Sequence, residues 1–578
     1  MDSNSTNQNM AGQSPAFVTP SYMFKEETEF YINSNRDKLL DAETCSKELF
    51  EQIQCKIMAE NSLREKEDKI RRIRELPLIS IEMLIAARYD VALVAGGDKS
   101  NMGKTASLST DKRMKLPIAI YQFTGDNYGV WEVTNSPYES FGVLVEQYLP
   151  SASKKDKMEV FTAVKGRLRV VYKCCIPYYV AVNNGIFDVL TKQFYAFSPD
   201  VVFTSKIHTN LNMNAQNPVL HIPEDGSQWD CDGWLDSLGT PEFVEHIKEV
   251  IQAACLPLAP RDKMVLFYSR SGNNGKGTIC QLIRNLLGEE TVVSIPLTEF
   301  SKEYGLSKLP NAVAVITDEN DVSSFNKGLG NLKSVITGDV VTINEKYVPT
   351  FDFRFQGLVL QCCNDLPNGT DKTGSFQRRL HIIPFQNCFT GCQKRYIKSQ
   401  LIHREDVLEY ILKKVLIDMP YREEFTETPM TQDALNQYIM ETNSVVRFLS
   451  EILPEAQWDL LPATDFLYEG YKNWYKKVSP SGKVCGRNEF IESVKKFVND
   501  DPDTSAVWEW TDSTRTKGYI DCQVREPLIV EYNMYAFQND SFSIGSVHRE
   551  YACANKLKSK YSGLKRKVQG TNTVSTTD

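Results

Sequence analysis

Long apolar runs, a signal sequence and zinc-ligand spacings are all missing from this sequence. No stretch of 18 apolar residues occurs, which excludes an ordinary membrane-spanning helix. The first residues, MDSNSTNQNMAGQS, are polar and lack the apolar core of a signal peptide. The 14 cysteines are scattered, and their spacings do not supply the four ligands that structural zinc needs. We therefore expect a soluble intracellular protein with reduced thiols and no membrane contact.

Positive charge is also in short supply, since 74 acidic residues outweigh 66 Lys and Arg and leave a net charge of −8. The chain as a whole is no polycation, so any binding of nucleic acid must use a local basic surface. One basic segment is residues 549–567, with seven Lys or Arg and one Glu. Such a segment binds nucleic acid in some proteins and is merely solvated in others.

The first half of the chain mixes helices and strands. We expect a disordered tail over residues 1–20 and a mostly helical region of unknown role over 21–114, with a charged, solvated helix at 63–76. Segments rich in β-branched and aromatic residues, and a tight turn at residues 183–185, predict an α+β domain over 115–224.

The second half has a different texture. From residue 225 to 430, apolar strands alternate with amphipathic helices, which predicts an α/β fold. Residues 431–540 hold three amphipathic helices and, at 508–522, the pattern of a β-hairpin, which together indicate a small winged-helix domain. A basic and then polar tail is expected over 541–578.

Two segments are similar to a phosphate-binding loop, and each departs from the usual pattern G-x-x-x-x-G-K-[ST]. RSGNNGKGTIC, residues 270–280, begins with Arg270 and has Gly277 where Ser or Thr is usual. GGDKSNMGKT, residues 96–105, ends in Gly-Lys-Thr but has Asp98 in place of the first Gly. A phosphate loop opens a helix, so that amide groups and the helix dipole face the phosphates. Only the first segment is followed by a helix with an apolar face, so we predict that it binds nucleotide and that residues 96–105 form a surface loop.

Polar side chains stand beside three further strands. In VAVITDEN, residues 313–320, the apolar strand runs into Asp318 and Glu319, as the Mg²⁺-binding strand of an ATPase requires. FQGLVLQCCND ends with Asn364 close by, and an amide there could contact the γ-phosphate. Arg378 and Arg379 precede another strand and could reach a phosphate held by a neighbouring subunit. Each feature alone also fits an ordinary surface acid or salt bridge, but their order after the loop indicates a ring-forming ATPase.

These motifs resemble those of the superfamily 3 helicases, in particular the helicase half of the poxvirus-type and phage/plasmid-type primase-helicases. SGNNGKGT is similar to the family's Asn-Gly-Lys loop, CNDLP to its sensor-1 turn and FQRRLHIIPF to its arginine-finger segment. LKSVITGDVVTINEKYVPTFDF, residues 332–353, resembles the segment that forms a DNA-contacting hairpin in the ring's pore. Residues 182–207 are similar to the end of the pre-helicase domain, and VVRFLSEIL with LYEGYKNWYKK resembles the winged-helix region.

The resemblance implies an AAA+-like P-loop ATPase core between a pre-helicase α+β domain and a C-terminal winged helix. Lys276 would bind the β- and γ-phosphates, and Asp318 would hold Mg²⁺ with Thr278 as a second candidate ligand. Glu319 would polarise the attacking water, and Asn364 would act as the sensor. The residues that line the nucleotide would be Ser271, Gly272, Asn273, Asn274, Gly275, Lys276, Gly277 and Thr278.

The same resemblance assigns residues to contacts beyond one subunit. Either Arg378 or Arg379 would act on the ATP of the neighbouring subunit. Lys346, with Lys333 behind it, would contact the backbone of single-stranded DNA in the pore. A solvated turn lysine is the alternative for Lys346 without the family.

The implied function is that of an ATP-dependent replicative DNA helicase of a virus, phage or plasmid. It would act as a homo-hexameric ring with ATP and Mg²⁺ on single-stranded and forked DNA, in the cytoplasm if the host is prokaryotic or the virus cytoplasmic. The alternative is an ATP-regulated origin-binding or initiation protein with little unwinding activity. A P-loop ATPase that ignores nucleic acid is disfavoured, because residues 332–353 would then have no purpose.

A primase centre is not expected in this chain. Primases of the related kind need an acidic D-x-D pair followed by a His, and here His208 precedes Asp230-Cys231-Asp232. The D-x-D also lies in a Trp-rich linker ahead of the predicted ATPase. We predict that these residues are not catalytic and that any primer comes from a separate primase or polymerase.

Overall fold

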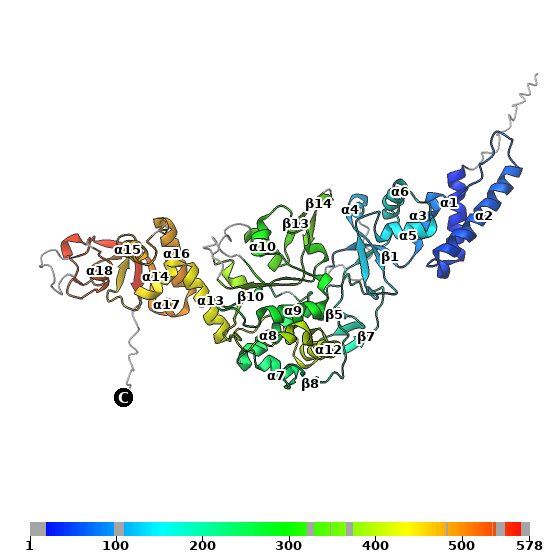
Figure 1. Ribbon diagram of the computed structural model, residues 1–578. Coiled ribbons are helices and arrows are strands. Elements are labelled where there is room, and N and C mark those ends of the chain that lie inside the picture. Colours follow the sequence, from blue (N-terminus) through cyan, green and yellow to red (C-terminus); the bar gives the residue numbers. More distant parts are fainter. Residues whose placement is uncertain are drawn as a thin grey trace, which may run out of the picture.

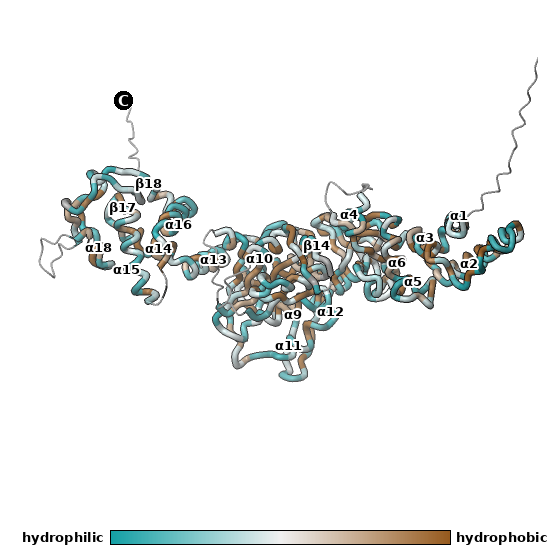
Figure 2. The backbone as a smooth tube through the Cα atoms, turned by 90° about the horizontal axis from the view of Figure 1, so that it is seen from above, coloured by the Kyte–Doolittle hydropathy of each residue, from teal (hydrophilic) through white to brown (hydrophobic). Residues whose placement is uncertain are grey.

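The computed structural model describes residues 19–97, 109–259, 261–320, 329–346, 348–365, 374–480, 482, 484–534, 536–538 and 550–567. These residues form an elongated molecule with an N-terminal part rich in helices, a central part built on a parallel sheet and a C-terminal part (Figure 1). Apolar segments gather inside the central part, and the chain around α11 (Arg395–Ser399) is more hydrophilic (Figure 2).

The N-terminal part packs helices against a four-stranded sheet of order β3-β2-β1-β4. β1 runs parallel to β4 and antiparallel to β2. Its elements are α1 (Pro20–Ser34), α2 (Ala42–Ser62), α3 (Leu78–Ala87), β1 (Val91–Ala95), α4 (Thr110–Lys115), β2 (Ile118–Tyr121), β3 (Trp131–Thr134), α5 (Ser140–Tyr148), α6 (Lys154–Lys165) and β4 (Val170–Tyr172).

Two expectations for this part differ from the structure. One core joins side chains from Met23 to Leu168, and β1 pairs with β2, so the expected boundary at residue 114/115 runs through a single packed unit. The helix expected at 63–76 does not form, because the chain leaves α2 and turns back on it. Both ends of the Asn61 amide bond the backbone of Ile70, with Oδ1 accepting at 2.7 Å and Nδ2 donating at 2.8 Å. This turn buries Ile70 and Leu76, whereas a helix with charges all round would bury little.

The central part contains a five-stranded parallel sheet of order β11-β12-β15-β10-β16, which confirms the expected α/β class. Two small antiparallel sheets, of β5–β7 and of β8 with β9, precede it. The elements are β5 (Tyr179–Val182), β6 (Gly185–Asp188), β7 (Gln193–Tyr195), β8 (Leu220–His221), β9 (Gln228–Trp229), α7 (Cys231–Asp236), α8 (Pro241–Cys255), β10 (Met264–Tyr268), α9 (Lys276–Leu287), β11 (Val292–Val293), β12 (Ala314–Thr317), α10 (Leu329–Ile336), β13 (Val340–Glu345), β14 (Val348–Arg354), β15 (Leu358–Cys363), β16 (Leu380–Pro384), α11, α12 (Glu405–Lys413) and α13 (Pro429–Thr442).

The two faces of this sheet are covered by different elements. Val265 and Phe267 of β10 face a core shared with α8, α9 and α12, while Leu266 faces a core shared with α10, β13 and α13. Strands buried on both faces account for the continuous apolar runs in the sequence. The first core also takes in side chains of β5 and β6, so the expected boundary at 224/225 again crosses a shared interior.

The C-terminal part has a three-stranded antiparallel sheet of order β17-β19-β18. Its elements are α14 (Ser444–Ile452), β17 (Leu460–Pro462), α15 (Tyr468–Val478), α16 (Arg487–Asp500), α17 (Pro502–Val507), β18 (Trp508–Arg515), α18 (Leu528–Glu531) and β19 (Lys560–Arg566). The three helices expected after residue 440 are confirmed as α14, α15 and α16.

The hairpin expected at 508–522 is wrong, because β18 pairs with β19 rather than with the residues that follow it. β19 lies in the segment expected to be a basic tail. Its Tyr561 and Leu564 are buried among the helices, and this burial outweighs the local hairpin pattern. The basic segment is therefore partly an integral strand.

Candidate active site

The loop between β10 and α9 has the backbone of an anion-binding turn. Asn273 and Gly275 have positive φ angles of 54° and 92°. Gly275 is the N-cap of α9, so the helix N-terminus opens toward the loop. The buried Asn274 braces the turn, since its Nδ2 donates to the Ser271 carbonyl at 2.5 Å and its Oδ1 accepts from the Lys276 amide at 3.3 Å. A Cβ added at Gly272 would meet nothing within 4 Å, which leaves open space above the loop.

The side chain of Lys276 is buried at the carboxyl edge of the sheet. Its Nζ donates to Asn364 Oδ1 at 2.8 Å and to the Cys363 carbonyl at 3.1 Å. β10 and β15 are adjacent and parallel, so their carboxyl ends bring the loop and Asn364 together. Burial lowers the pKa of the Lys276 ammonium. The structure thus brings together two residues that the sequence placed after separate strands.

The acids after β12 lie two strands away from the loop strand. Asp318 Oδ1 accepts from Nη1 of Arg284 at 2.8 Å, and Arg284 also donates to the Ile316 carbonyl at 2.9 Å. Glu319 is exposed. Arg284 lies on α9 and was not singled out from the sequence. In the sequence, Arg284 stands out only as a charged residue on a helix whose other face is apolar.

The residues present fit a nucleotide with Mg²⁺ better than a metal alone. Within the described ranges, no group of three or more His, Cys, Asp and Glu side chains is placed to hold a metal ion. Mg²⁺ usually takes one or two protein carboxylates together with phosphate oxygens and water. Asp318 and Glu319 could supply carboxylates, and Thr278 in the first turn of α9 could supply a hydroxyl where Gly277 has none.

Arg378 and Arg379 occupy a short 3-10 turn (Gln377–Arg379) before β16 and have different surroundings. Arg379 is half-buried, and its Nη1 donates to the Ser375 carbonyl at 2.6 Å. Arg378 is exposed, and no side chain in the described part of the chain bonds it. Arg378 could therefore reach another subunit without breaking a hydrogen bond to a side chain, whereas Arg379 would have to leave the Ser375 carbonyl.

The two lysines expected to contact DNA are also placed differently. Lys346 is exposed at the turn between β13 and β14, with Nζ 5.9 Å from the ring centre of Tyr304. Lys333 on α10 is half-buried, and its Nζ donates to Ser375 Oγ at 2.6 Å. Lys333 therefore supports the segment that carries the arginines, and Lys346 is the lysine that faces solvent.

The D-x-D residues take part in contacts that build the fold. Asp230 caps α7 by accepting from the Gly233 amide at 2.8 Å. Asp232 accepts from Tyr410 at 2.6 Å and pairs with Lys414 at 2.7 Å. His208 lies 2.9 Å from Glu290. These contacts give both aspartates of the D-x-D pair a place in the fold, and their lack of a catalytic role stays a prediction.

Two further sequence predictions concern the rival loop and the thiols, and the first of them lies almost wholly outside the described residues. Of the rival loop at 96–105, all but its first two residues lie outside the described ranges; β1 precedes them, and the short α4 that follows buries no side chain. All 14 cysteines are free thiols, with Cys280 and Cys362 3.4 Å apart beneath the phosphate loop.

Comparisons with known proteins give distant matches. A family model described as "Family of unknown function (DUF5906)" matches residues 267–379, which run from β10 to the arginines. The chain is 22% identical over 366 residues to "Putative helicase 121R" of Invertebrate iridescent virus 3, covering 56% of this chain and 38% of the relative. It is 24% identical over 249 residues to "Putative helicase 022R" of Frog virus 3, covering 39% and 25%. It is 22% identical over 219 residues to "Putative helicase L207/L206" of Acanthamoeba polyphaga mimivirus, covering 37% and 22%.

The chain therefore spans well under half the length of these curated relatives. Among solved structures, two of the NrS-1 C-terminal region align with TM-scores of 0.36 at 11% and 13% identity. They cover 66% and 76% of this chain and 83% and 94% of those chains, and the TM-score is too low to carry an argument. None of the helices in the described ranges has the length and apolar character to cross a bilayer. The comparisons thus place the chain beside proteins of large DNA viruses that carry helicase names.

Proposed function

We propose that this chain is an ATP-dependent DNA helicase that acts in replication as a ring of identical subunits. The observation that carries the proposal is the meeting of Lys276 with Asn364 at the carboxyl edge of the sheet, at 2.8 Å. Ligands of parallel α/β sheets bind at this edge, and a helix N-terminus there favours phosphate. The sheet order, with the loop strand β10 between β15 and β16, supports a P-loop core of the AAA+ kind.

In this proposal Lys276 and the amides of the loop bind and orient the phosphates of ATP. When bound, ATP with Mg²⁺ supplies the phosphoanhydride bond and the charge that stabilises its cleavage. Asp318, whose carboxylate also accepts a hydrogen bond from Arg284, would hold the metal. Glu319 would orient the attacking water. Asn364 would turn from Lys276 toward the γ-phosphate, and Arg378 would reach the site of the neighbouring subunit. Thr278→Ala tests the second metal ligand, because an unchanged Mg²⁺ requirement of the ATPase would exclude Thr278.

DNA binding is assigned to two surfaces. The β13–β14 hairpin presents Lys346 to solvent and would line the pore of a ring. In the C-terminal part, α14, β17, the helices α15 to α17, β18 and β19 follow one another, with α18 in the long connection between the last two strands. This order, with the sheet order β17-β19-β18, supports a winged helix with an insertion between β18 and β19. Any primer would be made by a separate primase or polymerase.

The test is strand displacement on forked DNA with ATP and Mg²⁺, comparing the wild type with Lys276→Ala. We expect unwinding and DNA-stimulated ATPase in the wild type and neither in the variant. DNA-stimulated ATPase without unwinding would favour the alternative, an ATP-regulated origin-binding protein. ATPase that is indifferent to DNA would contradict both.

A further inference from the structure

Residues 386–403, between β16 and α12, fold back over the phosphate loop. The Phe389 amide donates to the Asn273 carbonyl at 2.8 Å, and Asn273 Nδ2 lies 3.3 Å from Thr390 Oγ1. At the other end, the Ile402 carbonyl accepts from Asn285 of α9 at 2.8 Å. The segment is therefore fixed to both the loop and the helix that follows it.

Within this segment, α11 carries Lys398 to the start of α9. The helix is anchored on its far side, because Tyr396 donates to Asp225 at 3.0 Å and Lys394 pairs with the same carboxylate at 3.4 Å. A Cβ atom added to Gly277 would lie 3.2 Å from Nζ of Lys398. The ammonium group thus lies directly over the residue that replaces the usual Ser or Thr.

The charges around this point are unbalanced. In the described part of the chain, no carboxylate pairs with Lys398, and the partners of Lys276 are carbonyl and amide oxygens. Lys276 and Lys398 thus both lie near the positive end of the α9 dipole, and this concentration of positive charge favours an anion such as a polyphosphate.

We propose that Lys398 is a second phosphate-binding cation supplied by the same subunit, and that Gly277 provides the space for it. The inference rests on the proposed nucleotide site and deepens it. It also accounts for the missing hydroxyl in the loop, because a side chain at position 277 would crowd the ammonium group, which lies 3.2 Å from the position of an added Cβ. The ligand class is a nucleoside triphosphate, whose phosphates would lie between Lys276 and Lys398.

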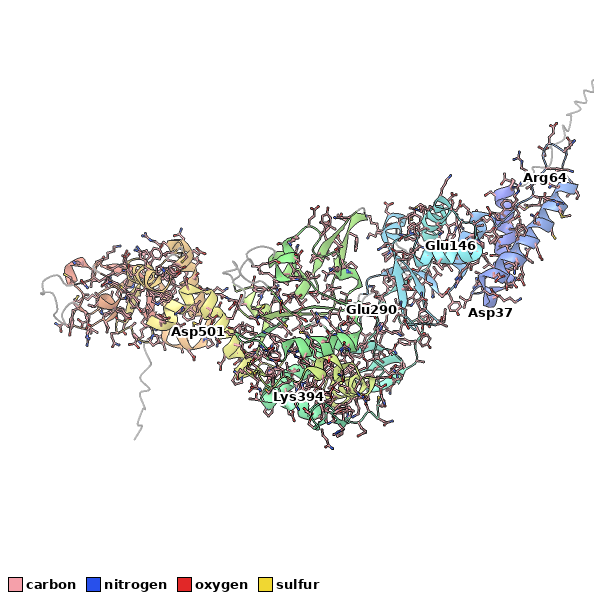
Figure 3. The ribbon with its side chains drawn as sticks, in the orientation of Figure 1. Asp37, Arg64, Glu146, Glu290, Lys394 and Asp501 are labelled. Atoms are coloured by element: carbon pink, nitrogen blue, oxygen red, sulfur yellow. The ribbon has the colours of Figure 1, made fainter. Side chains whose placement is uncertain are left out.

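The test is a titration of the full chain with fluorescent N-methylanthraniloyl-ATP, with Mg²⁺ and with chelator. Charge-assisted hydrogen bonds are the strong ones, so Lys398→Met should weaken binding about ten- to a hundred-fold without changing the melting temperature. Lys398→Arg should retain most of the affinity. Lys47→Met is the matched control, since Lys47 is exposed on α2 and pairs there with Glu43, and it should bind like the wild type. Lys394 is left unchanged in this test, because its pair with Asp225 on the lower surface of the central part anchors α11 (Figure 3).

A second comparison tests the role of Gly277. Gly277→Ala should push the flexible ammonium group away and weaken binding, and the double variant with Lys398→Met should be no weaker than Lys398→Met alone. Additive losses would contradict the link between these residues. If Lys398→Met binds like the wild type while Lys276→Met loses binding, the inference about Lys398 is overturned and the nucleotide site stands. If Lys276→Met also binds like the wild type, the proposed nucleotide site itself is wrong.

Discussion

Nζ of Lys276 lies 2.8 Å from Oδ1 of Asn364, although Lys276 opens helix α9 and Asn364 follows strand β15. The amide oxygen of Asn364 accepts a hydrogen bond from the Lys276 ammonium group. In the proposed nucleotide complex, a phosphate oxygen would accept this hydrogen bond. This exchange would free Asn364. In the proposed site, the position of Asn364 would therefore depend on the bound nucleotide.

Asn364→Ala should therefore lower the rate of ATP hydrolysis by about a hundred-fold, as the loss of a positioned amide does in other enzymes. ATP binding should change much less, because Lys276 remains. The measurements are kcat and nucleotide affinity at saturating Mg²⁺. Asn331→Ala is the control, since Asn331 is an exposed amide that bonds the Phe300 carbonyl at 2.9 Å. Equal losses in both variants would contradict a role in the site.

Substitutions of Arg378 and Arg379 should have different effects on ATPase activity and on the melting temperature. Arg378→Ala should reduce ATPase strongly and leave the melting temperature unchanged, because Arg378 is exposed. Arg379→Ala should lower the melting temperature, because Arg379 ties the 3-10 turn to Ser375. Mixing Arg378→Ala with Lys276→Ala chains should restore some ATPase. No recovery at any ratio would argue against sites shared between subunits.

Lys346→Ala should weaken binding of single-stranded DNA and remove its stimulation of the ATPase, while the ATPase without DNA stays intact. The loss of one phosphate contact should reduce the salt slope of binding by about one unit. Lys302→Ala is the control, because Lys302 is exposed but pairs with Glu299 at 2.5 Å. An unchanged salt slope for Lys346→Ala would place the DNA elsewhere.

The stability of the central part should depend on pH through His381. Burial lowers the pKa of His381 from 6.5 to about 3, helped by the neighbouring His246. Below pH 6.5 the unfolded chain takes up a proton that the folded protein refuses until about pH 3, so stability falls as the pH decreases through this window. The slope reaches about 1.4 kcal/mol per pH unit for this one group.

His381→Gln should make the free energy of unfolding depend less on pH, by the slope that corresponds to one proton. The free energies come from urea unfolding curves between pH 3 and pH 6.5. The exposed His221 offers the control variant His221→Gln, which should keep the wild-type slope. A slope unaffected by His381→Gln would mean that this histidine is protonated in the folded protein.

The basic segment near the C-terminus should behave as part of the fold. Leu564 in β19 is fully buried, so Leu564→Ala should lower the free energy of unfolding of the C-terminal part by about 2–5 kcal/mol. Lys560→Ala on the same strand, where the side chain is exposed, should change it by less than about 0.5 kcal/mol. Equal, small effects would restore the interpretation of a solvated tail.

The sequence by itself determined the elements that have a strong local pattern. The apolar run of β10 and the spaced apolar face of α9 predicted a strand, a loop and a helix, and the structure confirms these elements around the candidate phosphate loop with Arg270 and Gly277. The expected strand ends before Asp318 and Asn364 are likewise confirmed by β12 and β15. The spacing of apolar residues within a short segment predicts its secondary structure, so these predictions needed no knowledge of the elements that pack against it.

Only the tertiary structure decided which elements meet. It paired β18 with β19 in place of a local hairpin, joined regions across the expected boundaries, and placed Arg284 on Asp318 and Lys398 over Gly277. These contacts join residues far apart in the chain. They follow from burying apolar surface over the whole core, which no short sequence pattern specifies.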